Sequence, residues 1–311
     1  CGHIDTVDVR NQTWSYPPFE GVLEGNRMYG RGTADMKGGI AAMLGTAAWL
    51  AEQSAAPAKS VVFMFTADEE RGYGGAISLV KAGFVDDVEL LVIPEPTGCA
   101  VHVGQKGQLW VDVDFHGRAA HGALPEQGAN AALAAAHFAV LAAEEYGQLE
   151  DKPGLGRSTV SVNEVHGGWQ VNVIPETARV ALDFRVVDTK DRSIALSMVG
   201  AIGDRVGQRW GVKVDHRVRQ NRAPLVSDAA QPAVRAFIET ARAMGLAGDD
   251  LRVVPYSTDA AAIVPLASVP LLVCGPGSIY NAHQPDEYIE LSEVFDAYQL
   301  FVRYVSGLVE Q

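Results

Sequence analysis

The sequence has little cysteine, no cluster of basic residues and no long apolar run. Its cysteines, Cys1, Cys99 and Cys274, form no Cys-x-x-Cys pair, which argues against a disulfide framework or a thiolate zinc site and favours a reducing, cytoplasmic compartment. With 38 acidic residues against 25 basic ones, the chain lacks the basic face that nucleic acid requires. No segment approaches the roughly 18 apolar residues of a membrane span, and no signal peptide is recognisable.

The composition is nonetheless that of a folded protein. Of the 311 residues, 48% are hydrophobic and 20% are charged, which excludes a disordered chain and, at roughly 100–200 residues per domain, suggests two domains. The chain starts at Cys1-Gly2-His3 rather than at Met. We expect it to be the remainder of a longer protein.

Both ends of the chain carry an α/β pattern. Short, continuously apolar runs alternate with stretches of helical spacing, which is typical of strands in a buried parallel sheet. The predicted strands are 61–66, 90–94 and 270–274, and the predicted helices lie within 30–52, near 72–82, and at 229–244 and 291–309.

The middle of the chain follows a different order. Strands at 108–115, 159–165, 178–187 and 212–218 with helices at 129–145 and 191–209 give β-α-β-β-α-β, which is a split β-α-β unit with an antiparallel sheet. We therefore predict a domain of residues 106–218 inserted into a discontinuous α/β domain formed by residues 1–105 and 219–311.

Acidic and imidazole side chains follow the predicted strands of the α/β domain. Ligands bind at the carboxyl ends of strands in open α/β sheets, and two imidazoles with three or four carboxylates suit a pair of divalent cations such as zinc. The candidate residues are His3, Asp5, Asp35, Glu69, Glu70, Glu95 and His283.

Each of these residues alone has a plain structural interpretation. A histidine after a strand is usually hydrogen-bonded, Asp35 could cap the following helix, and Glu69 and Glu70 could lie at a helix N-terminus. Five separate segments, however, place acids or imidazoles at one edge of the sheet. A two-cation site needs one bridging carboxylate, a histidine and a second carboxylate for each cation, and an unligated base. The adjacent Glu69 and Glu70 can divide the last two tasks.

The ordered motifs resemble those of a known enzyme family. Segments 2–7 (GHIDTV), 29–38 (YGRGTADMKG), 66–70 (TADEE) and 94–97 (PEPT) are similar to motifs of the dizinc aminoacylase/carboxypeptidase G2 family, which includes acetylornithine deacetylase and succinyl-diaminopimelate desuccinylase. The resemblance implies a zinc-exopeptidase-like catalytic domain with an inserted ferredoxin-like α+β lid and dimerisation domain.

The resemblance also implies a role for each candidate. Asp5 would orient His3, Glu69 would be the general base, and the peptide bond between Asp35 and Met36 would be cis. Two divalent ions, Zn²⁺ with Co²⁺ as an alternative, would be held by His3 and Glu95 on the first ion, Glu70 and His283 on the second, and Asp35 bridging both.

The predicted lid adds further candidates. Residues 117–125 are similar to the family segment whose histidine reaches the active site of the other subunit and stabilises the oxyanion. His121 fits that position, whereas His116, on the preceding strand, is interpreted as structural. Asn172 and Arg185 match lid positions that contact the substrate, and a guanidinium suits a carboxylate, although a strand-end arginine is also a common surface residue. A homodimer through the lid is therefore expected.

The substrate follows from two further segments. Residues 275–288 resemble the acetylornithine deacetylase form of the last motif, and 256–260 resemble the Thr-Glu-Ala loop of that group, with Asp259 in place of Glu. The resemblance implies hydrolysis of the amide bond of an N-acyl amino acid, N-acetylornithine or a related N-acetyl amino acid. Asp259 would contact a cationic side chain, or would merely cap a short helix. A succinyl-diaminopimelate desuccinylase, a carboxypeptidase or dipeptidase, and an inactive metal-binding protein stay open as alternatives.

Overall fold

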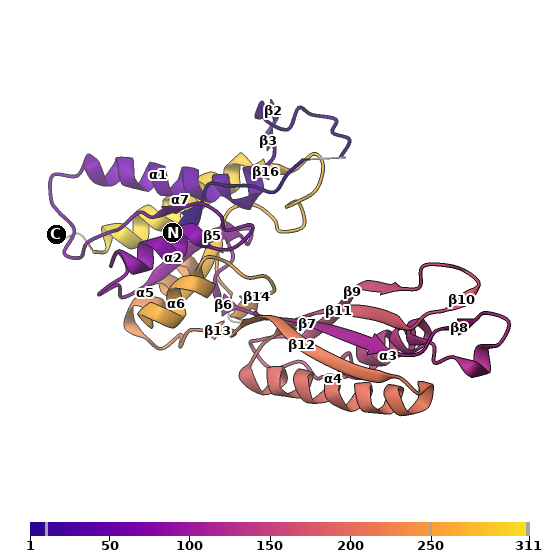
Figure 1. The fold of residues 1–311 in the computed structure, drawn as a ribbon. Coiled ribbons are helices and arrows are strands. Elements are labelled where there is room, and N and C mark those ends of the chain that lie inside the picture. The colour runs from indigo at the N-terminus through magenta and orange to yellow at the C-terminus, as the bar shows by residue number, and fades with distance from the viewer. Residues whose placement is uncertain (10–11, 249–250, 309–311) are drawn as a thin grey trace. The chain divides into compact units, whose positions relative to one another are not determined.

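The chain divides into two compact units in a computed structural model that describes residues 1–9, 12–248 and 251–308. Residues Cys1–Gln105 with Leu225–Gln311 form what we call the interrupted unit, and Lys106–Pro224 form the inserted unit (Figure 1). The inserted unit continues past residue 218 because strand β12 (Lys213–Arg222) stays paired with β7 (Gly107–His116) to its end. Among the described residues, no helix is both long and apolar enough to cross a membrane.

The inserted unit is a four-stranded antiparallel sheet with two helices packed on one face (Figure 1). Its chain order is the β-α-β-β-α-β order predicted from the sequence. Asn130 and Asp188 cap the two helices by accepting main-chain N–H hydrogen bonds. The remaining elements are α3 (Ala131–Tyr146), β9 (Thr159–Gly167), β11 (Thr177–Val186), α4 (Thr189–Trp210), and the small ribbon of β8 (Ala120–His121) and β10 (Val173–Ile174), with the 3-10 turn η2 (Pro125–Gln127) between β8 and α3.

The core of the inserted unit lies between the sheet and its helices. Alternate residues of β7, from Leu109 to Phe115, are fully buried there, as expected for a strand with one face against a helical layer. Phe115 packs edge-on against Phe138 of α3, and Tyr146 packs in the same way against Phe184 of β11.

The interrupted unit is built around a mixed sheet. Strand β15 runs parallel to β5 and antiparallel to β6, and β14 runs parallel to β6. The predicted strands 90–94 and 270–274 are β5 and β15, and their parallel pairing is confirmed. The sheet is mixed because of β6, which the sequence did not predict; the connection from β5 to β6 is too short for a parallel crossover. The strands are β5 (Leu91–Pro96), β6 (His102–Gln105), β13 (Leu225–Val226), β14 (Arg252–Val254) and β15 (Leu271–Gly275).

Helices cover both faces of this sheet. Alternate residues of β15 point to opposite layers, so that Leu271 and Val273 pack with α2 and α6, and Leu272 and Cys274 pack with α1, α5 and α7. Both layers use the short apolar strands that the sequence predicts. The helices are α1 (Gly38–Ala51), α2 (Gly74–Lys81), α5 (Pro232–Ala243), α6 (Ala260–Ala267) and α7 (Leu291–Ser306); the predicted end of the last helix, residue 309, lies outside the described residues.

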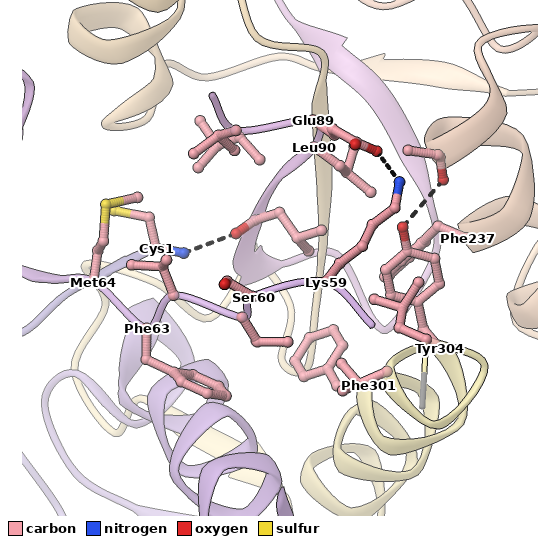
Figure 2. A pocket seen from close by; sticks show the side chains of 18 of the residues that line it. Cys1, Lys59, Ser60, Phe63, Met64, Glu89, Leu90, Phe237, Phe301 and Tyr304 are labelled. Carbon is pink, nitrogen blue, oxygen red and sulfur yellow. Dashed lines mark hydrogen bonds and ion pairs between the residues drawn. The ribbon is translucent and has the colours of Figure 1, made fainter. Parts of the chain in front are cut away.

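Strand β1 (Gly2–His3) pairs in parallel with β4 (Phe65–Thr66). The predicted strand at 61–66 is shorter than expected, because only its last two residues lie beside β1. The preceding residues instead line a pocket of about 700 Å³, with Phe63, Leu90 and Phe301 on its walls (Figure 2). At one side of this pocket the main-chain nitrogen of Cys1 donates a hydrogen bond to the Val92 carbonyl at 2.9 Å.

A small antiparallel ribbon joins two distant parts of the interrupted unit. Strand β3 (Arg27–Tyr29) pairs with β2 (Val22–Glu24) on one side and with β16 (Tyr288–Glu290) on the other. The ribbon was not predicted, and it brings the loop after β3 next to the loop before β16. These two loops carry Asp35 and His283.

Candidate metal centre

His3 ends β1 and lies in the interior, 1% exposed. Its Nδ1 is 3.0 Å from the main-chain oxygen of Asp5 and 3.5 Å from the Asp5 carboxylate. A proton on Nδ1 leaves Nε2 available as a ligand atom. The Asp5 carboxylate also accepts the main-chain N–H groups of Glu69 and Glu70, at 3.3 Å each. Asp5 therefore ties the histidine loop to the loop that carries the two glutamates.

Asp35 lies in a kinked turn, η1 (Thr33–Lys37), directly before α1, and its own backbone is not helical, with φ −119° and ψ 97°. Its carboxylate is placed between two imidazoles: Oδ1 is 3.0 Å from His3 Nε2, and Oδ2 is 3.3 Å from His283 Nε2. Helix α1 begins at Gly38 with no side-chain cap, so the alternative that Asp35 caps this helix is wrong. The peptide bond between Asp35 and Met36 is cis, as the family resemblance implied.

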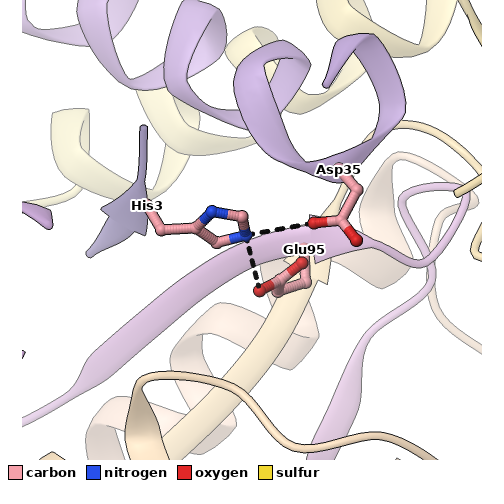
Figure 3. Close-up of side chains that lie close together, drawn as sticks. All are labelled: His3, Asp35 and Glu95. Atoms are coloured by element: carbon pink, nitrogen blue, oxygen red, sulfur yellow. Dashed lines mark hydrogen bonds and ion pairs between the residues drawn. The ribbon is translucent and has the colours of Figure 1, made fainter. Parts of the chain in front are cut away.

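Two clusters of donor atoms share Asp35. The first is His3, Asp35 and Glu95, with His3 Nε2 turned toward both carboxylates and 3.7 Å from Glu95 Oε1 (Figure 3). The second is Asp35, Glu70 and His283, with His283 Nε2 3.2 Å from the Glu70 carboxylate. In each cluster the donor atoms lie within 4.8 Å of one another.

The charges of this site shift the pKa values of both histidines. Burial would lower the pKa of His3, but the hydrogen bond to Asp35 and the nearby carboxylates raise it to about 9. The pKa of His283 is raised to about 10, first by its hydrogen bonds to Asp35 and Glu70. Burial alone would raise the pKa of Asp35, yet the two imidazoles hold it well below its usual range. The carboxylates thus create a field that favours positive charge.

Glu69 differs from Glu70 in its surroundings and in its pKa. Burial, with Asp259, Glu70 and Asp35 as further causes, raises the pKa of Glu69 to about 8, and Glu69 belongs to neither donor cluster among the described residues. Helix α2 begins at Gly74, and Asp68 rather than Glu69 accepts the Gly74 N–H. The alternative of a helix N-terminus for Glu69 and Glu70 is therefore wrong.

Asp259 is buried, 2% exposed. It precedes α6, but its side chain does not cap that helix, so the capping alternative is wrong. The carboxylate instead accepts a hydrogen bond from the Thr66 hydroxyl, at the end of β4. Burial raises the pKa of Asp259, and its Oδ1 has no hydrogen-bond partner among the residues that the structure describes. Asp259 thus supports the strand ends around His3.

The other predicted residues lie in the inserted unit. His121 is exposed at the end of β8, and its Nδ1 accepts the Ala123 N–H. Asn172 lies beside it, because its carbonyl accepts the Gly122 N–H at 2.7 Å. Arg185 is near the opposite end of β11, roughly 25 Å along the strand from Thr177, where it makes a two-pronged ion pair with Asp183.

His116, interpreted as structural, ends β7 in an exposed position, 3.7 Å from the Asp215 carboxylate. The inserted unit therefore brings His121 and Asn172 together and holds Arg185 apart from them.

The donor set fits two divalent cations. Imidazole nitrogens and carboxylate oxygens are ligands that zinc accepts, and each cluster supplies three. The one carboxylate that both clusters share lies between the two histidines, as a bridging ligand must. His3 and Glu95 are buried, whereas the His283 side chain is 49% exposed, so the second cluster faces the solvent more openly.

Two further residues were missed from the sequence. Glu287 and Arg31 form a buried ion pair, and Glu287 also accepts the main-chain N–H of Asp35. Glu287 lies four residues after His283 within the last motif, and Arg31 lies in the glycine-rich motif. Their membership in the two motifs was the available signal, but their pairing depends on the unpredicted ribbon.

Fold and donor set together are those of a metal-dependent amidohydrolase. The model of peptidase family M20/M25/M40 matches residues 1–307, and the chain belongs to this family. A probable succinyl-diaminopimelate desuccinylase of Staphylococcus aureus (strain MSSA476) is 31% identical over 93% of this chain and 77% of the relative. An acetylornithine deacetylase of Klebsiella pneumoniae (strain 342) is 29% identical over 93% of this chain and 74% of the relative. The comparison therefore does not favour acetylornithine deacetylase over the desuccinylase.

Solved structures show the same fold. The aminopeptidase PepT of Bacillus cereus aligns with a TM-score of 0.78 at 20% identity, over 99% of this chain and 79% of that one. A dinuclear metal-binding peptidase of the M20 family from Bacillus subtilis aligns with a TM-score of 0.73 at 17% identity, over 99% of this chain and 80% of that one.

Proposed function

We propose that this protein hydrolyses the amide bond of an N-acyl amino acid with two divalent cations, Zn²⁺ or alternatively Co²⁺. The observation that supports this most strongly is the Asp35 carboxylate, with one oxygen toward His3 and the other toward His283. His3 and Glu95 would hold the first cation, Glu70 and His283 the second, and Asp35 would bridge them.

Glu69 is the proposed general base. Two cations, when bound, would lower the pKa of a bound water and polarise the substrate carbonyl. Glu69 would take the proton from the attacking water and return it to the leaving amine. In the metal-free protein its pKa is raised to about 8, first by burial, and burial of a carboxyl group favours the protonated form that it needs when it returns the proton to the leaving amine. Asp5 would keep Glu69 in place through the Glu69 N–H.

The inserted unit is proposed to act as a lid and dimerisation domain. His121 would stabilise the oxyanion in the active site of a second copy, and Asn172 and Arg185 would contact the substrate carboxylate or carbonyl. This predicts a homodimer. A mixture of His121→Ala and Glu69→Gln proteins tests it, since a mixed dimer combines an intact Glu69 with an intact His121 in one active site. Recovered activity in the mixture supports the role in trans, and an inactive mixture with confirmed subunit exchange contradicts it.

The first candidate substrate is N-acetylornithine, because segment 275–288 resembles acetylornithine deacetylase. The second is N-succinyl-diaminopimelate, because relatives named for its hydrolysis match 93% of the chain. Asp259 is proposed to favour the cationic side chain of ornithine through charge rather than contact, since its carboxylate is buried against Thr66.

A panel of substrates tests the proposal. N-acetylornithine, N-acetyl-lysine, N-acetylcitrulline, N-succinyl-diaminopimelate and dipeptides are incubated with the full chain and added zinc or cobalt, and released amine is measured. Glu69→Gln should lose turnover and keep its metal, whereas the exposed Glu52→Gln should match the unmodified protein. Near-normal kcat in Glu69→Gln would refute the mechanism. Two bound metals without turnover on any substrate would instead support an inactive metal-binding protein.

A further inference from the structure

A buried ion pair joins the loop before Asp35 to the loop after His283. Arg31 Nη1 donates to Glu287 Oε2 at 2.5 Å, and the two side chains are 1% and 0% exposed. The other oxygen, Glu287 Oε1, accepts the N–H groups of Ala34 and Asp35 at 3.0 and 3.1 Å. The main chain at Asp35 is therefore held by a carboxylate that lies 252 residues further along the sequence.

The same arginine also reaches the loop of His283. Arg31 Nη2 donates to Gln12 Oε1 at 3.0 Å, and Gln12 Nε2 donates to the main-chain oxygen of His283 at 3.3 Å. The Arg31 guanidinium lies 5.0 Å from the Trp14 ring centre, which limits its freedom to move. One side chain thus connects the loops that carry Asp35 and His283, two of the three donors of the second cluster.

Neither Glu287 nor Arg31 belongs to a donor cluster of the described residues. Both oxygens of Glu287 accept hydrogen bonds from the protein, so this carboxylate orients its neighbours. We propose that Arg31 and Glu287 are a positioning pair that sets Asp35 against His283 and so determines how tightly the second cation is held. The inference rests on the metal site proposed above.

A charged acceptor is required at position 287 for a physical reason. Three donors, two main-chain N–H groups and one guanidinium N–H, converge on Glu287, which is buried at 1% exposure. An amide at this position has one oxygen, and its NH₂ group would face a donor, which leaves a buried group unpaired. If the pair only stabilised the fold, its removal would lower the Tm of the protein and leave cation affinity unchanged. If it positions Asp35 against His283, its removal also lowers cation affinity.

The ribbon supplies a matched control pair. Arg27 Nε and Glu290 Oε1 are 2.6 Å apart on β3 and β16, with side chains 45% and 28% exposed. This pair joins the two strands next to the loops of Arg31 and Glu287, but it reaches neither Asp35 nor His283 by any contact found among the described residues. Glu290→Gln therefore removes an ion pair of the ribbon without touching the proposed positioning pair.

The test measures cobalt binding to the full chain. Stepwise Co²⁺ titration is followed by visible absorption, with chelator competition for the two affinities and thermal unfolding of the metal-free proteins. In Glu287→Gln, we expect both ions to bind more weakly because both clusters use Asp35. The second ion should be affected more, by about 10–100 times, because the pair is also linked to the His283 loop, and its absorption should change. Glu290→Gln should match the unmodified protein in both affinities and in its spectrum.

Two variants cover the case in which Glu287→Gln does not fold. Arg31→Lys keeps the charge but loses the fork that reaches Gln12, and Gln12→Ala removes only the link to His283; each should weaken the second ion alone. Unchanged second-ion affinity and spectrum in a folded Glu287→Gln protein, or in both of the milder variants if it does not fold, overturns the inference. Failure of the unmodified protein to bind two ions refutes the proposed function itself.

Discussion

Metal binding at this site should release protons, because the two histidines that face the carboxylates are protonated near neutral pH in the metal-free protein. The pKa of His3 is raised to about 9 and that of His283 to about 10. A ligand imidazole must be neutral. Zn²⁺ is therefore added to the metal-free protein at a series of pH values. Each ion that binds should displace one imidazole proton.

The size of the effect follows from the His3 pKa. Near pH 7.5, removing a proton from a buried group with a pKa of about 9 costs about 2 kcal/mol, which lowers the apparent affinity of the first ion about 30-fold. The affinity should rise about 10-fold for each pH unit until the pH passes the pKa of His3. The affinity of the second ion should also rise with pH. The rise should be smaller, because His283 is half exposed and solvent screens its interaction with the carboxylates.

Calorimetric titration in buffers of different ionisation enthalpy counts the released protons. His283→Gln should release one proton fewer, while His121→Gln, an exposed residue of the inserted unit, should behave like the unmodified protein. Zinc affinity that stays constant between pH 7 and 9, with no buffer dependence of the heat, would refute the assignment of His3 and His283 as ligands.

Two further predictions concern stability. Folding raises the pKa of Glu69 to about 8 and that of His3 to about 9, so the folded protein binds protons more tightly than the unfolded chain. The stability that each group adds is fully present below its pKa in the unfolded chain and is lost as the pH rises through its pKa in the folded protein. The Tm of the metal-free protein should therefore fall between pH 5 and 9, and it should fall less in Glu69→Gln. A Cβ at Gly39 would lie 2.1 Å from the Pro94 oxygen, so Gly39→Ala should destabilise by about 1–3 kcal/mol and weaken the first ion. By contrast, a Cβ at Gly200 in α4 would make only an ordinary contact, 4.0 Å from His216 Cε1, so Gly200→Ala should stabilise by about 0.5–1 kcal/mol. Equal urea midpoints for the two alanine variants would contradict this.

Much of the candidate site could be predicted because its residues follow apolar strands. His3 and Glu95 lie at the ends of β1 and β5, and the carboxyl ends of neighbouring strands meet at one edge of a sheet. The inserted unit could be predicted equally well, because the central strands β7 and β11 bury alternate apolar residues and each of the two long helices has a capping residue. The predicted strand at 212–218 ends four residues before β12 does, because the last residues of β12 are polar and show no alternation of apolar and polar side chains.

Pairings between distant segments could not be predicted. The ribbon of β2, β3 and β16 has strands of three residues each, too short for a periodic pattern to emerge. The Arg31–Glu287 pair depends on that ribbon, and no local preference encodes a partner 256 residues away. The Asp259 side chain likewise turned from the helix end to Thr66, because a tertiary partner outweighed the capping position.

The order of the ligands along the chain has a consequence for synthesis on the ribosome. His3, Asp35 and Glu95 all precede the inserted unit, whereas His283 follows it. At about 5–20 residues per second, His283 emerges tens of seconds after the first three donors. During that interval these donors lack strand β15, which pairs with β5, and the Glu287 carboxylate, which holds the main chain at Asp35. Both donor clusters therefore reach their final geometry only after the segment that follows the inserted unit has been made.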